Sequence, residues 1–259
     1  MNYTKAIKMR KSNNKPYLSI VIPAYNEELN LKNGVLEEVA DYLKGAFYSW
    51  EVIVVDDGSI DSTREYVKKF IQKMAGWKLI ENQHGGKALT VMTGLLASSG
   101  EIALFTDMDQ ATPIWGVEKF FDKFSEGYDI VIGSRVGRKG APFLRKLTAW
   151  GFATLRNIFL GLPFLDTQCG FKAFNKKSRE VIFPKMSNSW SKMRAKGAAV
   201  HAGFDIETLF IARKLGFKIT AVDVDWHHVG SERVQLIKDS LDAVRDMFRI
   251  LWNDLKGKY

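Results

Sequence analysis

Apolar and polar positions alternate with two different periods along the first half of the chain. Five short apolar runs have the length and composition of buried strands. These runs are 17–23, 51–56, 78–81, 101–106 and 129–133. The stretches between them carry apolar residues at helical spacing, and the predicted helices are 28–48, 62–74, 87–98 and 117–124. This alternation predicts βαβ units and an α/β fold with a mostly parallel central sheet flanked by helices.

Two amphipathic stretches follow after residue 134, where the regular alternation ends. In 143–164 aromatic residues are interleaved with cations, as in helices that lie on a membrane surface. In 234–255 apolar residues recur at helical spacing, with basic residues among the polar positions. We favour a membrane surface as the partner of the first stretch. For the second, packing against the rest of the domain is the slightly favoured alternative.

Positive charge is concentrated in two segments of the 259-residue chain, whose net charge is +9. Residues 1–16 contain five basic residues and no acid, and residues 130–165 contain six basic residues and no acid. The rest of the chain is therefore slightly acidic. Basic segments of this kind indicate an anionic partner, namely a phosphate group, a nucleic acid or a membrane face.

Composition excludes several classes of protein. Hydrophobic residues make up 46% of the chain and charged residues 26%, which excludes wholesale disorder. Cys169 is the only cysteine, so an intrachain disulfide and a cysteine-based zinc site are excluded, and we expect a small buried thiol. The longest uncharged stretch, 88–100, has 13 residues, whereas a spanning helix needs about 20 apolar ones. The N-terminus also lacks the apolar core of a signal peptide, so we expect a cytoplasmic protein.

Two aspartates, Asp107 and Asp109, directly follow the predicted strand 101–106. Residues two apart in an extended chain point the same way, so both carboxylates converge on one spot. Carboxylates without a neighbouring cysteine or histidine favour a hard cation, Mg²⁺ or Mn²⁺, that keeps positions open for phosphate oxygens. Asp57 follows the strand 51–56 in the same way, and we favour a ligand role for it over simple turn chemistry.

The common nucleotide-binding fingerprints are missing from the chain. No G-x-G-x-x-G follows the first predicted strand, and Gly86-Lys87 lacks the upstream glycine of a Walker loop. Both absences argue against a dehydrogenase and against a P-loop ATPase.

Together, these motifs resemble those of family 2 glycosyltransferases of the A-type fold, and most closely the dolichyl-phosphate glucosyltransferase and mannosyltransferase branch. The matching segments are SIVIPAYNE (19–27), VVDDGS (54–59), GK (86–87), DMD (107–109), GSR (133–135), DTQCGFK (166–172) and FDIE (204–207). They occur in family order from residue 17 to about residue 230. The DTQCGFK segment is similar to the glucosyl branch rather than the mannosyl branch.

The resemblance implies a nucleotide-diphospho-sugar transferase fold and a donor site. The residues expected to hold the nucleoside are Pro23, Tyr25, Glu27 and Asp57, with Lys87 nearby. Asp107 and Asp109 are expected to hold Mg²⁺ or Mn²⁺ on the donor diphosphate. In the mannosyl enzymes a glutamine two residues beyond the second aspartate completes the metal site. Here that position is Ala111, so Gln110 or water is the expected third ligand.

The resemblance also implies an acceptor site. Arg135 and Arg145 are expected to face the phosphate of a polyprenyl or dolichyl phosphate and, with Asp109, to form the catalytic set. Asp205 and Glu207 open a predicted helix, where stabilising the helix dipole and serving the site are equally good interpretations.

These expectations predict a peripheral membrane enzyme that transfers a hexose with inversion of the anomeric centre. UDP-glucose is the favoured donor. The alternatives are GDP-mannose as donor, a glycan as acceptor, or a non-catalytic module that binds anionic lipid; nucleic acid is not an expected partner. The predicted organisation is a basic tail (1–16), a glycosyltransferase domain (17–230) and a C-terminal amphipathic helix (231–259). Within the domain, 17–134 is expected to bind the nucleotide sugar and 135–230 the acceptor.

Overall fold

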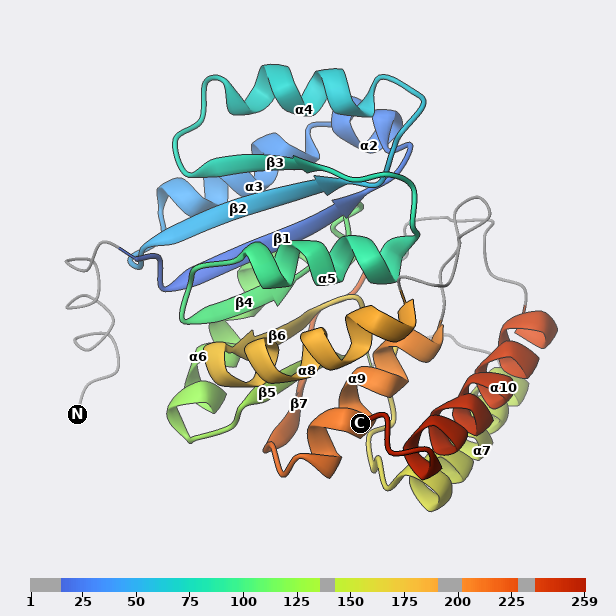
Figure 1. Ribbon diagram of the computed structural model, residues 1–259. Helices are drawn as coiled ribbons and strands as arrows, with labels where there is room; N and C mark the ends of the chain where they lie inside the picture. Colours follow the sequence, from blue (N-terminus) through green and yellow to red (C-terminus); the bar gives the residue numbers. More distant parts are fainter. Residues whose placement is uncertain (1–14, 136–142, 191–201, 228–235) are drawn as a thin grey trace.

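A seven-stranded sheet forms the centre of the computed structural model, which describes residues 15–135, 143–190, 202–227 and 236–259 (Figure 1). The strand order is β3-β2-β1-β4-β6-β5-β7. The strands are β1 (Leu18–Ala24), β2 (Trp50–Asp56), β3 (Trp77–Glu81), β4 (Ile102–Phe105), β5 (Ile130–Ser134), β6 (Lys172–Asn175) and β7 (Ile219–Asp223).

The sheet is mostly parallel, as predicted. β1 pairs in parallel with β2 and β4, β2 with β3, and β5 with β7. Only β6 runs antiparallel within the described sheet, between β4 and β5. The five predicted strands are confirmed to within one or two residues. β6 and β7 were not predicted, and they add the second half of the chain to the same sheet.

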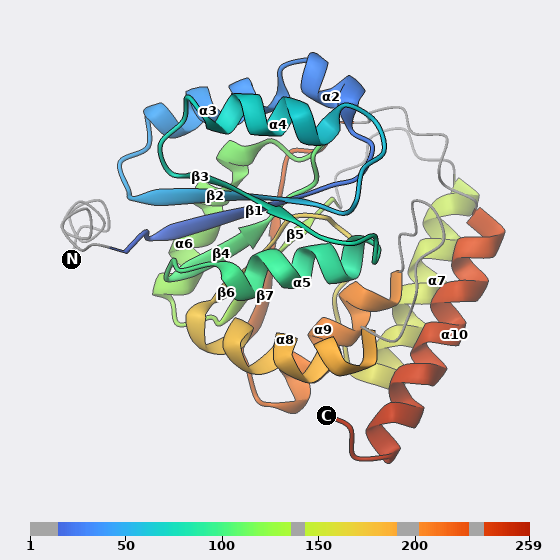
Figure 2. The same ribbon diagram turned by 45° about the horizontal axis from the view of Figure 1, so that its top comes forward.

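Helices cover both faces of the sheet (Figures 1 and 2). The described helices are α2 (Glu28–Lys32), α3 (Val35–Lys44), α4 (Thr63–Ile71), α5 (Lys87–Ala97), α6 (Glu118–Ser125), α7 (Phe143–Leu160), α8 (Lys176–Trp190), α9 (Ala202–Lys214) and α10 (Leu236–Leu255), with a 3₁₀ turn at Ile114–Val117. Alternate residues of β1 enter two separate cores. Ile20 and Ile22 pack with α3, α4 and α6, whereas Val21 packs with α5, α8 and α9.

One predicted helix, 28–48, is wrong, because the chain forms two helices there. α2 ends at Lys32 and α3 begins at Val35. Gly34 lies between them with φ +83°, in the left-handed region that glycine adopts without strain. The apolar spacing continues across this break, which is why periodicity did not reveal it.

α7 and α10 correspond to the two amphipathic stretches and lie side by side at one edge of the molecule (Figures 1 and 2). α7 ends at Leu160, four residues before the predicted end, and α10 is described from Leu236 to Leu255. Among the described helices, none combines the length and the apolar character needed to cross a membrane.

Candidate functional site

The carboxyl ends of the parallel strands do not all lie at the same level. Ala24 of β1 pairs with Asp56 of β2, which pairs with Glu81 of β3, so these three strands end level. β4 ends earlier, because its last residue, Phe105, pairs with Val21. Because β4 ends earlier than its neighbour β1, there is room at the carboxyl end of β4 for the residues that follow it. Ligands of open α/β sheets bind outside such strand ends.

Asp56 and Asp57 are both buried at the end of β2 but have different partners. Asp56 binds Arg64, with Nε and Nη2 at 3.0 and 2.9 Å from its Oδ2. The carboxylate of Asp57 accepts hydrogen bonds from the backbone N–H groups of Gly85 and Gly86 at 2.9 and 2.8 Å. Asp56 therefore anchors α4, whereas Asp57 holds the loop that leads to Lys87.

His84 joins two residues predicted to bind the nucleoside. Its ring stacks on Tyr25 with centroids 4.3 Å apart, and its Nδ1 lies 2.9 Å from Asp57 Oδ2. Pro23 lies one residue before the end of β1, and Glu27 directly precedes α2. The structure brings Tyr25 and Asp57 together through His84, a residue outside the segments that match the family. A histidine directly before a pair of glycines carries no local signal for such stacking.

The two aspartates predicted to hold a metal lie in the loop after β4. Asp107 forms an ion pair with Lys87, and Asp109 Oδ1 accepts a hydrogen bond of 3.0 Å from the backbone of Ala111. Gln110 is buried, with φ +48°, and its Nε2 donates to the carbonyl of Asp107 at 2.9 Å. Its Oε1 is buried and has no hydrogen-bond partner among the described residues.

This donor set fits a hard cation. Among the described residues no three acidic, histidine or cysteine side chains gather as a closed metal cage. Mg²⁺ and Mn²⁺ do not need one, since they bind to one or two carboxylates and take further ligands from water and phosphate. The buried Oε1 of Gln110, which has no hydrogen-bond partner among the described residues, is a further oxygen in the same loop as the two aspartates.

Two lysines balance the acidic groups of the site. Burial lowers the pKa of Lys87, but the carboxylates of Asp107, Asp205 and Asp109 outweigh it and raise that pKa above its ordinary value. Lys172 is 1% exposed and binds Asp205 at 2.6 Å.

Glu207, by contrast, lies in the core, where its carboxylate accepts a hydrogen bond of 3.0 Å from Trp190 and burial raises its pKa. The FDIE segment thus supplies one carboxylate to the site and one to the core. Of the two, only Asp205 lies near the predicted metal ligands, and it also lies in the first turn of α9, so both interpretations remain for it.

Arg135 is fixed by Asp166 at the end of β5. Its Nε lies 2.6 Å from Oδ2 and its Nη2 lies 2.9 Å from Oδ1, so the two side chains form a paired contact. Burial alone would raise the pKa of Asp166, but the hydrogen bonds and charge of Arg135 hold it at about 2. Arg145 lies in the first turn of α7, where the structure does not describe side chains.

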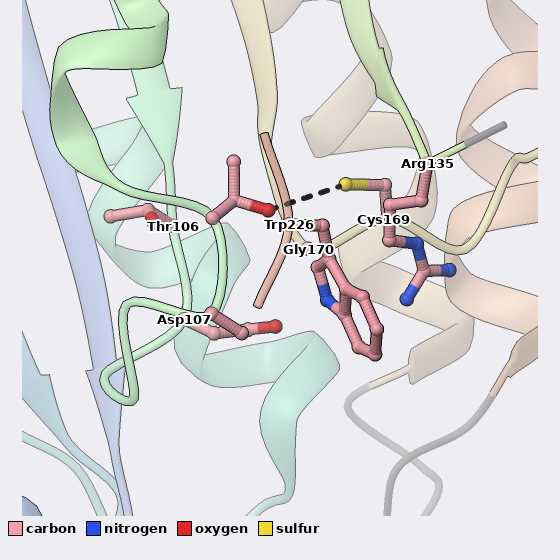
Figure 3. A pocket seen from close by; sticks show the side chains of 8 residues that line it. Thr106, Asp107, Arg135, Cys169, Gly170 and Trp226 are labelled. Carbon is pink, nitrogen blue, oxygen red and sulfur yellow. Dashed lines mark hydrogen bonds between the residues drawn. The ribbon is translucent and has the colours of Figure 1, made fainter. Parts of the chain in front are cut away.

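One pocket joins these two parts of the site (Figure 3). It is lined by Thr106, Asp107, Ala111, Thr112, Arg135, Cys169, Gly170 and Trp226. The Asp107 carboxylate and the Arg135 guanidinium both extend toward Trp226, and the Arg135 Cζ lies 6.0 Å from the centroid of that ring. Cys169 is a buried thiol, as predicted, whereas Gly170 and Trp226 were not predicted to line the site. The carboxylate predicted to hold the metal and the cation predicted to hold the acceptor therefore face the same space.

Comparison with known proteins identifies the family. A sequence model described as "Glycosyl transferase family 2" matches residues 19–183. The chain belongs to this family. It is 31% identical to a dolichyl-phosphate beta-glucosyltransferase of Dictyostelium discoideum, over 93% of this chain and 76% of that protein. The protein is therefore a glycosyltransferase, and the predicted family is confirmed.

Solved structures confirm the A-type transferase fold. Mannosyl-3-phosphoglycerate synthase from Rubrobacter xylanophilus superposes with a TM-score of 0.64 at 18% identity, over 98% of this chain and 79% of that one. Glucosyl-3-phosphoglycerate synthase from Mycobacterium tuberculosis, solved with Mn²⁺, UDP and its product, gives 0.59 at 23% identity, over 96% and 82%. At these identities the likeness shows the fold alone.

Proposed function

We propose that this transferase moves a hexose, glucose from UDP-glucose in the first instance, to the phosphate of a polyprenyl or dolichyl phosphate. The observation that carries the proposal is the pocket shared by Asp107 and Arg135. A donor diphosphate held near Asp107 and an anionic acceptor held by Arg135 would meet there. The name of the Dictyostelium relative supports the same donor sugar and the same acceptor class.

The donor would be held by residues at the ends of β1, β2 and β4. Pro23, Tyr25, Glu27 and Asp57 would contact the nucleoside, and Lys87 the diphosphate. Asp107 and Asp109 would hold Mg²⁺ or Mn²⁺, with Gln110 Oε1 or water beside them. When bound, this cation supplies positive charge that stabilises the departing nucleoside diphosphate.

The acceptor phosphate needs no general base, because its oxygen is already anionic at neutral pH. That oxygen forms a bond to the anomeric carbon as the bond from this carbon to the nucleoside diphosphate breaks, which inverts the anomeric centre. Arg135 and Arg145 would neutralise and position the acceptor, so that two negatively charged reactants can approach each other. The proton balance is unchanged.

A membrane surface would present the lipid acceptor, and α7 and α10 carry an apolar face that fits it. The rings of Phe159 in α7 and Phe248 in α10 pack against each other at a tilt of 50°, with centroids 6.4 Å apart. Around them Ile158, Trp252 and Leu255 are 70%, 59% and 82% exposed. The cations Arg245, on α10, and Lys256, directly after it, are exposed. Exposed aromatic and aliphatic residues beside cations are typical of helices at an anionic membrane interface. We therefore place the enzyme peripherally on the cytoplasmic face of a membrane.

Replacing Phe248 and Trp252 together by aspartate is expected to abolish binding to liposomes. The two substitutions remove apolar side chains that would insert into the lipid, and they add negative charges that the anionic headgroups repel. Flotation with vesicles of phosphatidylcholine and phosphatidylserine at low salt measures it. Val181→Asp, at an exposed apolar position of α8, should float like the wild type. Equal flotation of all three proteins, or no flotation of the wild type, would contradict the proposal that this face binds a membrane.

A scan of nucleotide sugars tests the proposed reaction. Radiolabelled UDP-glucose and GDP-mannose are each incubated with polyprenyl phosphate or with a soluble glycan, with and without Mn²⁺. Label should move from UDP-glucose into the lipid phase only when the cation is present. Transfer of label from GDP-mannose would show that GDP-mannose is the donor, and label in the glycan would show that a glycan is the acceptor. A lack of transfer in every combination would overturn the proposal.

A further inference from the structure

Arg135 pairs with Asp166 along one edge of its guanidinium. Its Nε donates to Oδ2 at 2.6 Å and its Nη2 donates to Oδ1 at 2.9 Å. An arginine has five N–H donors in one plane, so this side-on pair uses the N–H of Nε and one N–H of Nη2. The other N–H of Nη2 and both of Nη1 donate to no residue that the structure describes. The end of the guanidinium formed by Nη1 and Nη2 is therefore available to an anion.

The carboxylate of Asp166 is itself held in place by the backbone. Its Oδ2 accepts a hydrogen bond from the N–H of Arg135, and its Oδ1 accepts one from the N–H of Gln168, each at 3.1 Å. Rotation of the Asp166 side chain would break these two hydrogen bonds together with the two from the guanidinium. Asp166 is therefore a fixed support that sets the orientation of the Arg135 guanidinium.

The pocket meets the other side of this guanidinium. Its lining residues include Arg135 and Trp226 but not Asp166. Figure 3 shows the guanidinium extending toward Trp226, and its Cζ lies 6.0 Å from the centroid of that ring. The edge that Arg135 presents to the pocket is therefore the edge that Asp166 leaves unused. Two N–H groups on such an edge match two oxygens of one phosphate group.

We propose that Asp166 is a positioning residue, which turns Arg135 so that Nη1 and Nη2 bind two oxygens of a phosphate monoester in the pocket. The inference rests on the proposed function in that this anion is taken to be the acceptor phosphate. Asp166 itself does not touch the acceptor. It acts by fixing the plane and the direction of the guanidinium, and a two-point contact depends on both.

This arrangement selects a monoester over other acceptors. A phosphate monoester has three non-bridging oxygens, so two can bind Arg135 while the third stays free to attack the anomeric carbon. A phosphate diester has only two, and binding both to Arg135 would leave no nucleophile. A glycan hydroxyl offers a single oxygen without charge, which cannot accept from both N–H groups at full strength.

Charge and positioning predict opposite effects for Asp166→Asn. The substitution removes a negative charge close to the phosphate, so charge alone would make an anion bind more tightly. Asparagine has one side-chain oxygen, however, and cannot accept from both Nε and Nη2, so the guanidinium is free to turn. We expect the KM for farnesyl phosphate to rise about tenfold and the KM for UDP-glucose to stay unchanged.

A double variant separates positioning from a general structural role. Arg135→Met removes the guanidinium, and adding Asp166→Asn to it should weaken binding of farnesyl phosphate no further. A general structural role would weaken binding by the same factor in both backgrounds. Glu51→Gln is the matched control, because Glu51 is 5% exposed and pairs with Lys78 at 2.8 Å, at the start of β2 and away from the pocket. Its affinity for farnesyl phosphate should equal that of the wild type.

Calorimetric titration with farnesyl phosphate and with inorganic phosphate distinguishes failure of this inference from failure of the proposed function. Weaker binding of either probe to Asp166→Asn supports the inference, even if the wild type transfers no sugar. Weakening for farnesyl phosphate alone identifies a lipid-linked anion, whereas equal weakening identifies the phosphate group itself. Unchanged or tighter binding of both probes, a further loss in the double variant, an equal loss in Glu51→Gln, or no binding to the wild type would overturn it. If Asp166→Asn does not fold, Arg135→Lys, which keeps the charge but has no such edge, is titrated by the same criteria.

Discussion

Replacing Asp109 by asparagine is expected to lower kcat/KM for sugar transfer by at least about 100-fold, because the variant lacks one of the two carboxylates proposed to hold the divalent cation. The exchange is nearly isosteric. Asparagine retains an Oδ1 that can accept the 3.0 Å hydrogen bond from the backbone of Ala111, so the loop after β4 should keep its shape. The loss should therefore appear in activity and in the Mn²⁺ concentration needed for it, with little change in melting temperature.

Asp122→Asn provides the matched control, since Asp122 is exposed on α6, away from the pocket. It should show wild-type kinetics and wild-type dependence on Mn²⁺. A wild-type rate in Asp109→Asn at limiting Mn²⁺ would contradict the metal role of Asp109. Asp107→Asn should lose activity too, although it also breaks the ion pair with Lys87.

Gly170→Ala is expected to remove most of the activity by moving a carboxylate, again by about 100-fold in kcat/KM. A Cβ at Gly170 would lie 1.9 Å from Oδ2 of Asp107 and 2.5 Å from its Cγ. Contacts this short cannot persist, and the side chain of Asp107 is the part that can rotate away. The carboxylate would then leave both Lys87 and the position where it is expected to hold a cation. Because only a side-chain end moves, the fold should be retained.

Gly151→Ala is the control for this substitution. Apart from the backbone of α7 itself, no described atom lies within 4 Å of a Cβ at Gly151, so alanine fits at this position of α7 and favours the helix. We expect its activity to be unchanged and its melting temperature to be equal or higher. Wild-type activity in Gly170→Ala would show that the position of the Asp107 carboxylate does not matter to the reaction.

The strands of the first half were predictable because each is an uninterrupted apolar run buried on both faces. In β2, the residues Val52, Ile53, Val54 and Val55 are all fully buried. Asp107 and Asp109 could be recognised as candidate ligands because they directly follow another such run. The local sequence was therefore enough to predict both the strand and the candidate metal ligands that follow it.

β6 could not be predicted, because its environment comes from distant segments. It has four residues, and both ends, Lys172 and Asn175, are polar. The burial of Lys172 depends on Asp205 of α9 and on the ring of Phe105 in β4, 5.3 Å from its Nζ. No periodicity within residues 172–175 reports those partners.

The same limit applies to Gly170 and Arg156. Gly170 lies against Asp107, which is 63 residues earlier in the sequence. The absence of space for a side chain at position 170 is therefore visible only in the folded structure. Arg156 was counted with the basic residues of 130–165, which are ordinarily solvated. It is only 2% exposed in the structure, which is a property of the packed helix and not of the sequence pattern.

The anomeric configuration of the product is the most direct test of the account. Wild-type enzyme is supplied with UDP-glucose, in which the sugar is α-linked, farnesyl phosphate and Mn²⁺, and the lipid product is examined by proton NMR. A single attack by the acceptor phosphate predicts glucosyl phosphate in the β configuration, with UDP as the other product. An α-linked product, or no glucosyl lipid at all, would contradict the account.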